Sequence, residues 1–329
     1  MADPKLDEMD RRLVNLAQSQ FPLGEQPFAA LGASLGMDGD EVISRLRRLK
    51  DENIVRLIGP VVDAGRLGYR TTLAGLSLAA DRLDEAGRAI AAHPLVSHCY
   101  EREHRFNLWI TLAAPEGVEL DYELHRLVAP LGARAAISLP ALRVFKLGVH
   151  FDMLDGNAAE TVTAPAVNSA QKKLNLSPQD RAVLNELQQD LPLEEAPFSA
   201  MAARAGMPLQ DFLAGCRLLL DAGVIRRYGA SVNHRRAGYE ANAMTCWKVS
   251  AGQVDNAGLE LAAMRQVSHC YERKTDALWP YNLFAMFHGR SRQECRKPAE
   301  DMTRQLGLGS PVLLFSTKEI KKERVRYLL

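Results

Sequence analysis

The heptapeptide Val-Ser-His-Cys-Tyr-Glu-Arg occurs twice in the 329-residue chain, at 96–102 and at 267–273. An identical segment so rich in functional side chains does not recur by chance in a chain of this length, and a repeat of this kind sets the whole architecture. The chain is therefore expected to be a tandem duplication, in which each half presents the same polar cluster. Its length fits two units of about 150 residues each.

Further matches extend the repeat over almost the whole chain. The offset is 170 residues at first and 171 at the heptapeptide, after which the second copy gains four residues. The matched pairs are Pro22–Phe28 with Pro192–Phe198, Gly68–Tyr69 with Gly238–Tyr239, Asn107 with Asn282 and Pro140 with Pro311. Between the copies, residues 155–175 are small and polar without an apolar period, which predicts a flexible linker.

Each half begins with a pattern typical of a helix-turn-helix. In the second copy Ser177 is a good N-cap, Pro178 follows at the first helical position, and Gly206 ends a short second helix. A third helix is expected at 208–221. The first copy repeats the order with helices expected at 11–20, 28–35 and 40–51.

The remainder of each half alternates as strand, helix, strand, strand, helix, strand, which is the ferredoxin-like order. The expected fold class is α+β: a tandem duplication, each half a helix-turn-helix (winged-helix-like) subdomain followed by a ferredoxin-like αβ-plait. The expected divisions are a helix-turn-helix at 1–52, a ferredoxin-like domain at 53–154, the linker at 155–175, a helix-turn-helix at 176–223 and a ferredoxin-like domain at 224–329.

Composition excludes several classes of protein. No apolar run approaches the length of about 18 residues that spans a bilayer, so no membrane association is expected. The polar, acidic N-terminus does not resemble a secretory signal. Five cysteines, an odd number without a Cys-x-x-Cys pair, argue against a disulfide framework or structural zinc and favour the cytoplasm. A formal net charge of +1 weighs against a dedicated nucleic-acid binder.

The third helix of each helix-turn-helix also argues against specific DNA binding. The first turn of a recognition helix normally presents basic or amide side chains to base edges. The first copy offers Asp38, Asp40 and Glu41 there, and the second offers Pro208, Leu209, Gln210 and Asp211. Acidic groups at this place would face phosphates, so we interpret the helices as scaffold or dimerisation elements.

The heptapeptide carries the candidate chemistry. Side chains alternate along a strand, so His98, Tyr100 and Arg102 are expected on one face and Ser97, Cys99 and Glu101 on the other. A guanidinium binds carboxylates, and an imidazole can donate a proton near neutral pH. A lone strand histidine is more often a packed structural residue, but the repetition of the trio at His269, Tyr271 and Arg273 favours a site for an anionic ligand that is held and protonated.

Several further residues flank the heptapeptides. His104 and Arg105 follow the first. The second is followed by an insertion at 277–280 that contains Trp279, then by Tyr281 and by His288, which stands where the first copy has Ala113. A separate basic group surrounds the repeated Gly-Tyr and includes Arg66, Arg70, Arg226 and Arg236, of which Arg66 and Arg236 align. These arginines are either a solvated turn or a clamp for carboxylates at the rim of the sheet.

The chain resembles the siroheme decarboxylases, in the fused form of the two-subunit enzyme from haem d1 biosynthesis. The resemblance covers nearly the whole chain and rests on VSHCYER with EHRFNLW in the first half and VSHCYER with WPYNL and FHG in the second. The helix-turn-helix and plait also resemble leucine-responsive/asparagine-regulator transcription factors. The first resemblance implies removal of the C12 and C18 acetate carboxyl groups of siroheme, which gives 12,18-didecarboxysiroheme. It implies no cofactor, because the iron belongs to the substrate.

The resemblance also suggests roles for the candidate residues. His98 and His269, then His104, would donate the proton, with Tyr100 and Tyr271 beside them as catalytic candidates. Binding of the substrate is assigned to a set that comprises Arg102, Arg273, Arg105, Arg66, Arg236, Trp279, Tyr281 and His288. A histidine could instead ligate the substrate iron. Because the halves differ after the heptapeptide, one half alone could hold the productive site, and we favour the second.

Two other functions remain open on the sequence. A haem- or tetrapyrrole-responsive transcriptional regulator would use the same pocket as a sensor, and a non-catalytic carrier would bind the tetrapyrrole without turnover. For the assembly we expect an intramolecular pseudo-dimer of the two halves, which could form a homodimer in turn.

Overall fold

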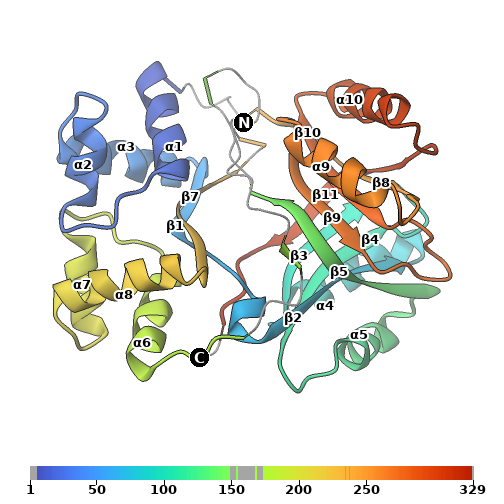
Figure 1. The fold of residues 1–329 in the computed structure, drawn as a ribbon, viewed down its shortest axis with the longest axis horizontal. Coiled ribbons are helices and arrows are strands. Elements are labelled where there is room, and N and C mark those ends of the chain that lie inside the picture. The colour runs from blue at the N-terminus through green and yellow to red at the C-terminus, as the bar shows by residue number, and fades with distance from the viewer. Residues whose placement is uncertain are drawn as a thin grey trace.

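The computed structural model describes residues 6–148, 153–154, 173–233, 235–236 and 238–327, and the backbone of 167–168. Most of the predicted linker at 155–175 lies outside the described residues. Two bodies are visible in Figure 1: the helices of both copies on one side, and a large sheet with its covering helices on the other.

The helical body contains both predicted helix-turn-helix units. Ser177 caps the first helix of the second copy by accepting a hydrogen bond from the Asp180 amide, and Gly36 and Gly206 end the short helices with φ of 74° and 69°. Buried side chains of all six helices form one continuous core. The helices are α1 (Glu8–Ser19), α2 (Pro27–Ala33), α3 (Gly39–Asp51), α6 (Pro178–Leu187), α7 (Pro197–Arg204) and α8 (Leu209–Asp221).

A two-stranded antiparallel sheet joins the two copies beneath these helices. Strand β1 (Val55–Val62) pairs with β7 (Ile225–Val232), so that Gly59 lies opposite Gly229. The expected ferredoxin-like domains at 53–154 and 224–329 include these strands, whereas in the structure the two strands form a sheet of their own. Pairing with the equivalent strand of the other copy satisfies their backbone groups without any plait strand.

Each half also contains the predicted plait, with helices on one face of a four-stranded sheet. The strand order is β5-β2-β4-β3 in the first half and β11-β8-β10-β9 in the second. The strands are β2 (Tyr69–Ser77), β3 (Val96–Arg102), β4 (Leu108–Pro115), β5 (Ala135–Leu147), β8 (Ala241–Trp247), β9 (Val267–Arg273), β10 (Leu283–Gly289) and β11 (Val312–Lys322). The helices are α4 (Leu83–Ala91), α5 (Leu120–Val128), α9 (Val254–Ala263) and α10 (Arg292–Gln305).

The last strand of each plait crosses to the other half. Strand β5 pairs with β2 through 135–140 and then with β9 through 141–147. Strand β11 pairs in the same way, first with β8 and then with β3. Through these two crossovers the four strands of each plait join into one closed barrel of eight strands in the described chain. The short strand β6 (Val167–Asn168) pairs with β5 outside this barrel. The two halves therefore form the expected intramolecular pseudo-dimer.

The register corrects one detail of the repeat. Pro140 lies opposite Thr72 on β2, and Phe315 lies opposite Ala243, the equivalent residue on β8. Pro140 is therefore equivalent to Phe315 and not to Pro311, so the four-residue gain of the second copy persists to the end of the barrel. The same offset of 175 makes Leu147 equivalent to Lys322.

An aromatic cluster fills one end of the barrel. Trp279, from the insertion of the second copy, is 1% exposed and has ring centroids 5.1 Å from Trp109 and 5.9 Å from Phe106. The insertion therefore closes this end with large side chains. Among the described residues, no helix combines the length and apolar character that crossing a membrane requires.

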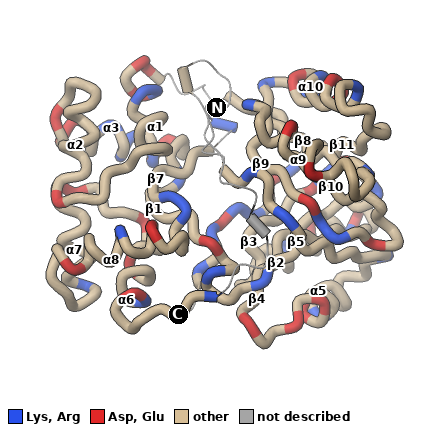
Figure 2. Tube along the Cα trace, in the orientation of Figure 1, with Lys and Arg blue, Asp and Glu red and all other residues tan. Residues whose placement is uncertain are grey.

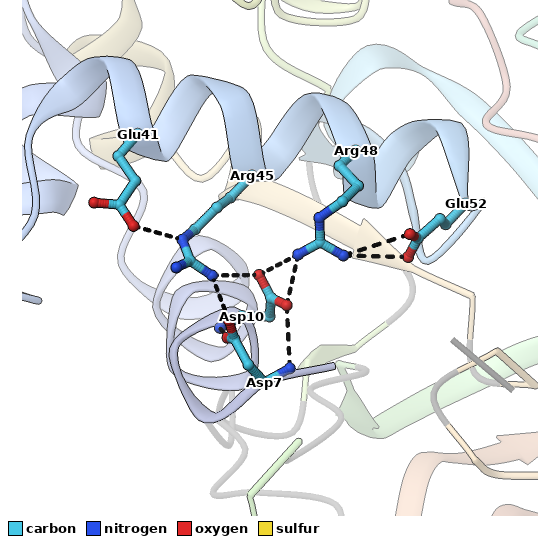
Figure 3. Close-up of polar contacts among 6 residues, drawn as sticks. All are labelled: Asp7, Asp10, Glu41, Arg45, Arg48 and Glu52. Atoms are coloured by element: carbon cyan, nitrogen blue, oxygen red, sulfur yellow. Dashed lines mark hydrogen bonds and ion pairs between the residues drawn. The ribbon is translucent and has the colours of Figure 1, made fainter. Parts of the chain in front are cut away.

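An ion network ties the first and third helices of the first copy together. Asp10 is 1% exposed and accepts hydrogen bonds from Arg48 at 2.6 Å and from Arg45 at 3.0 Å. Figure 3 shows the complete network, which consists of Asp7, Asp10, Glu41, Arg45, Arg48 and Glu52. Arg45 and Arg48 of α3 are thus directed toward acidic groups of the protein itself.

Asp10→Asn is expected to lower the free energy of unfolding by about 1.5–3 kcal/mol, because a buried acceptor of two charged donors loses its charge. Chemical denaturation measures the change. Glu8→Gln, at an exposed ion pair with Arg12, is the control and should change the free energy by less than about 0.5 kcal/mol. Equal effects of both variants would contradict a structural role for the buried network.

Candidate active site

A cavity of about 780 Å³ lies between the barrel and the β1–β7 sheet, which is within the range of small-molecule pockets. Both halves line it, with residues from β1 and β7, from β2 to β5, from β8 to β10, and from the end of β11 and the segment that follows it. Figure 2 shows basic positions around β1 and β3 in this middle part of the molecule. The duplication therefore places the two heptapeptides at one shared cavity.

Alternation along β3 and β9 directs the repeated trio into this cavity. His98, Tyr100 and Arg102 line it from β3. The equivalent lining residues on β9 are His269, Tyr271 and Arg273. The face predicted from the period of a strand is thus the face that meets the cavity.

A β-bulge adds a serine to each trio. The pairing of β3 with β4 shifts between Val96 and His98, so Ser97 is the extra residue of the bulge, and its hydroxyl lies 2.9 Å from His98 Nδ1. The same shift on β9 places Ser268 Oγ 2.9 Å from His269 Nδ1. Simple alternation had placed Ser97 on the opposite face, away from His98, which is wrong because a bulge interrupts the alternation.

Both histidines are held in the neutral form near pH 7. Burial lowers the pKa of His98 to about 4, and the positive charges of Lys322 and Arg56 act in the same direction. Burial lowers the pKa of His269 to about 3, again with a contribution from Lys322. With Nδ1 bound to its serine, each ring has Nε2 left for a group in the cavity. A carboxylate bound there would raise the pKa of the ring again.

The two arginines of the trios are buried cations. Arg102 donates to the Leu314 carbonyl at 2.8 Å and Arg273 to the Leu139 carbonyl at 3.0 Å, while each Nε is buried without a hydrogen-bond partner. Burial lowers the pKa of Arg102 to about 10 and also lowers that of Arg273. Among the described residues neither forms an ion pair, so both are available to an anionic ligand.

Each tyrosine lies between its histidine and its arginine. The guanidinium of Arg102 is 5.4 Å from the Tyr100 ring, and that of Arg273 is 4.6 Å from the Tyr271 ring. Burial raises the pKa of both phenols, and nearby Glu319 also raises that of Tyr100. Both phenols therefore remain protonated and can donate a hydrogen bond.

Two cations at the cavity were not among the candidates from the sequence. They are Lys322, the last residue of β11, and Arg324, whereas Arg226 of the Gly-Tyr basic group lines the cavity from β7, where it pairs with Asp63 at 2.7 Å. Burial lowers the pKa of Lys322 to about 8. The basic run at 321–326 was the available signal, but its contact with the first heptapeptide depends on the crossover of β11.

Four of the expected site residues do not line the cavity in the described part of the chain, because they pack at the closed end of the barrel. They are His104, Arg105, Trp279 and Tyr281. His104 stacks beside Phe106 and contacts Trp279, and Arg105 donates to the Leu278 carbonyl at 2.7 Å. Tyr281 packs against Trp279, with centroids 5.1 Å apart. The expectation that Trp279 and Tyr281 bind the substrate therefore does not fit this cavity, since Trp279 packs against Trp109 and Phe284 and Tyr281 packs against Trp279.

Only part of the predicted arginine clamp at the Gly-Tyr turns reaches the cavity. Arg70 and Arg226 line it, whereas Arg66, in a short 3-10 helix (Gly65–Leu67), and Arg236 are not among the described lining residues. By contrast, His288 lines the cavity as predicted, from β10.

Family comparisons agree with this architecture. A model described as the siroheme decarboxylase NirDL-like HTH domain matches residues 10–56 and 180–226, and one described as an AsnC-like ligand binding domain matches 66–146 and 236–321. The siroheme decarboxylase of Hydrogenobacter thermophilus is 35% identical over 325 residues, which cover 98% of this chain and 95% of that protein. The chain belongs to the siroheme decarboxylase family.

Two other members of the family bear on the cavity and on the duplication. A crystal structure of the siroheme decarboxylase NirDL in complex with an iron-uroporphyrin III analogue matches with a TM-score of 0.71 and 31% identity, over 98% of this chain and 94% of that one. The beta subunit of siroheme decarboxylase from Desulfovibrio desulfuricans is 40% identical over 152 residues, which are 46% of this chain and 96% of the subunit. One half of this family member thus corresponds to a whole subunit there.

In this siroheme decarboxylase family member the two identical heptapeptides have different neighbours. His98 lies opposite Lys322 on β11, whereas His269 lies opposite Leu147 on β5. Tyr100 donates to Glu319, itself paired with Arg56, whereas Tyr271 lies opposite Val144. The residues opposite His98 and Tyr100 on the partner strand are therefore charged, whereas those opposite His269 and Tyr271 are apolar.

Proposed function

We propose that the cavity between the barrel and the β1–β7 sheet binds siroheme and is where its C12 and C18 acetate groups lose their carboxyl groups. The enzyme is a siroheme decarboxylase, a carboxy-lyase. The observation that carries the location is the convergence of both His-Tyr-Arg trios on one cavity. The proposed product is 12,18-didecarboxysiroheme, and two CO₂ are released.

Binding of the substrate calls for cations that pair with its retained carboxylates. The decarboxylation itself requires an acid that protonates each new methyl group. When the bond between the methylene carbon and the carboxyl carbon breaks, CO₂ leaves and the electron pair stays on the methylene carbon and its ring. A proton from His269 or His98 then completes the methyl group. Charge and electrons balance without an oxidant, so we propose that the chain needs no cofactor of its own and that the iron is part of the substrate.

The arginines are proposed to grip carboxylates that the substrate retains. Arg102 and Arg273 offer buried donors at the cavity, and Lys322 adds a further cation. A guanidinium on the leaving carboxylate would stabilise the ground state and slow its departure. The more apolar surroundings of His269, with Leu147 and Val144 on the partner strand, suit the leaving group better.

Anaerobic incubation of the purified chain with siroheme, followed by mass spectrometry of the tetrapyrrole, tests this function. The expected result is loss of two CO₂ masses with siroheme as the only addition. Spectral binding of siroheme with an unchanged mass would overturn the proposal in favour of a sensor or a carrier.

The alternative of a DNA-binding regulator is disfavoured by the partners of the basic side chains on α3. Arg45 and Arg48 bind acidic residues, Arg47 donates to the Leu193 carbonyl at 3.1 Å, and Lys50 pairs with Asp190 at 2.5 Å. Phosphate binding would have to break these contacts. We therefore propose that the helices are a scaffold and that an electrophoretic shift assay with genomic fragments at 100 mM salt will show no specific complex.

Siroheme affinity is expected to fall as the pH rises through about 8. The pKa of Lys322 in the unliganded protein is about 8, and a bound carboxylate favours its charged form. Below pH 8 the charge is present before binding. Above it a proton must be taken up on binding, which costs up to about tenfold in affinity per pH unit. Optical titration between pH 7 and 9.5 measures this. Lys322→Met should bind more weakly at pH 7 and show a flatter profile, and an unchanged profile would contradict the assignment.

A homodimer of this pseudo-dimeric chain remains a prediction. Light scattering of the purified protein measures the mass directly. A mass of one chain would show that the pairing of the two halves within the chain is the complete assembly.

A further inference from the structure

Ser268 connects two histidines of the second half. Its hydroxyl oxygen lies 2.9 Å from His269 Nδ1 and 2.9 Å from His288 Nε2. Both contacts are shielded, because Ser268 is 2% and His288 9% exposed. The result is a continuous hydrogen-bonded line from β10 through the bulge of β9 to the ring that faces the cavity.

The first half lacks the outer member of this line. Ser97 contacts His98 at the same 2.9 Å, but the residue equivalent to His288 is Ala113, whose methyl group has no proton to give. Lys322 lies opposite His98 instead, and Leu147 lies opposite His269. Two identical heptapeptides thus have different hydrogen-bond partners and strand neighbours.

We propose that His288 and Ser268 form a proton relay that supplies His269, so that the second heptapeptide protonates the product while the first holds a retained carboxylate. The inference rests on the proposed function of the same cavity. In it His269 is the catalytic residue, and His288 and Ser268 act through it.

The relay balances one proton for each carboxyl group lost. Neutral His269 gives its Nε2 proton to the methylene carbon as CO₂ leaves. It receives the Ser268 hydroxyl proton at Nδ1, and Ser268 takes a proton from Nε2 of a charged His288. His288 ends neutral, and proton exchange with water after product release restores the starting state. Because burial lowers the pKa of His269 to about 3, this ring has no spare proton of its own near pH 7, which makes an outside supply useful.

The matched pair Ser268→Ala and Ser97→Ala tests the proposal, because each removes the same hydroxyl from the same heptapeptide. Steady-state decarboxylation of siroheme under anaerobic conditions gives kcat and KM for each. Ser268→Ala is expected to lower kcat about 100-fold with KM nearly unchanged. Ser97→Ala is expected to act mainly by raising KM, since it only orients His98.

Two further variants separate a relay from a structural role. Ser268→Thr keeps the hydroxyl and should restore kcat to within about threefold of wild type. His288→Gln keeps the size of the side chain but cannot release a proton, so it should match Ser268→Ala in kcat while siroheme still binds. Optical titration and thermal unfolding of every variant report binding and folding.

Equal kcat losses in Ser268→Ala and Ser97→Ala, or full kcat in His288→Gln, would overturn the relay while leaving the decarboxylase function intact. Absence of CO₂ release by the wild-type chain would overturn the proposed function and the relay together. A wild-type chain that turns over with a selective kcat loss in the second-half variants supports both.

Discussion

His269→Gln is expected to lower kcat for siroheme decarboxylation by about 100- to 10,000-fold, the range of a lost general acid. The glutamine keeps a polar group at the cavity but has no proton to release near pH 7. Binding should survive, because Arg102 and Arg273, the proposed carboxylate-binding groups at the cavity, are left in place. Single-turnover incubation with mass spectrometry of the tetrapyrrole separates siroheme from the singly and doubly decarboxylated products.

His98→Gln is the matched control for this prediction, since the same ring stands in the same heptapeptide. Next to Lys322 it is expected to raise KM more than it lowers kcat. Optical spectra of both variants with siroheme bound test the remaining alternative, in which a histidine ligates the substrate iron. A changed iron spectrum in His269→Gln with retained turnover would show that His269 is a ligand and not the acid.

The sequence predicted the duplication, both helix-turn-helix units and both plaits, because these follow from local signals. The caps at Ser177 and Pro178 and the glycine at 206 act within a few residues of their own position. The cavity-facing trio was predictable for the same reason, since the period of a strand fixes which side chains share a face.

Features that depend on strand pairing between the halves were not predictable. The crossover of β11 brings Lys322 opposite His98, 224 positions away in the sequence, and no local pattern encodes that contact. The bulge that turns Ser268 toward His269 is likewise a property of the pairing of β9 with β10. Identical sequences therefore acquired different surroundings only in three dimensions.

The prediction that Trp279 binds the substrate is wrong for a different reason. Trp279 lies in an insertion next to the heptapeptide, and proximity in sequence suggested contact with the ligand. Its indole instead packs behind Trp109 in the closed end of the barrel. Burial of a large apolar ring in a core removes more apolar surface from water than its exposure to a cavity does, and is therefore more favourable. An insertion at a strand connection can place its side chains in the core or at the cavity.

The buried arginines allow a final prediction in which stability and affinity respond differently. Arg102→Met and Arg273→Met each remove a guanidinium that is buried without an ion-pair partner among the described residues. Burying such a charge costs several kcal/mol. Methionine removes this cost, and the opposing loss is one hydrogen-bond donor each for the carbonyls of Leu314 and Leu139. The free energy of unfolding is therefore expected to stay within about 1 kcal/mol of wild type or to rise.

Siroheme affinity should instead fall by about 10- to 100-fold in each of these variants, which corresponds to a lost charge-assisted hydrogen bond of about 1.5–3 kcal/mol. Optical titration and chemical denaturation measure the two quantities on the same samples. Arg105→Met is the matched control, since Arg105 donates to the Leu278 carbonyl outside the cavity, and it should leave affinity unchanged. A large loss of stability in Arg102→Met and Arg273→Met would mean that the arginines hold the barrel together. A loss of affinity alone would mean that their buried charge is maintained for the carboxylates of the substrate.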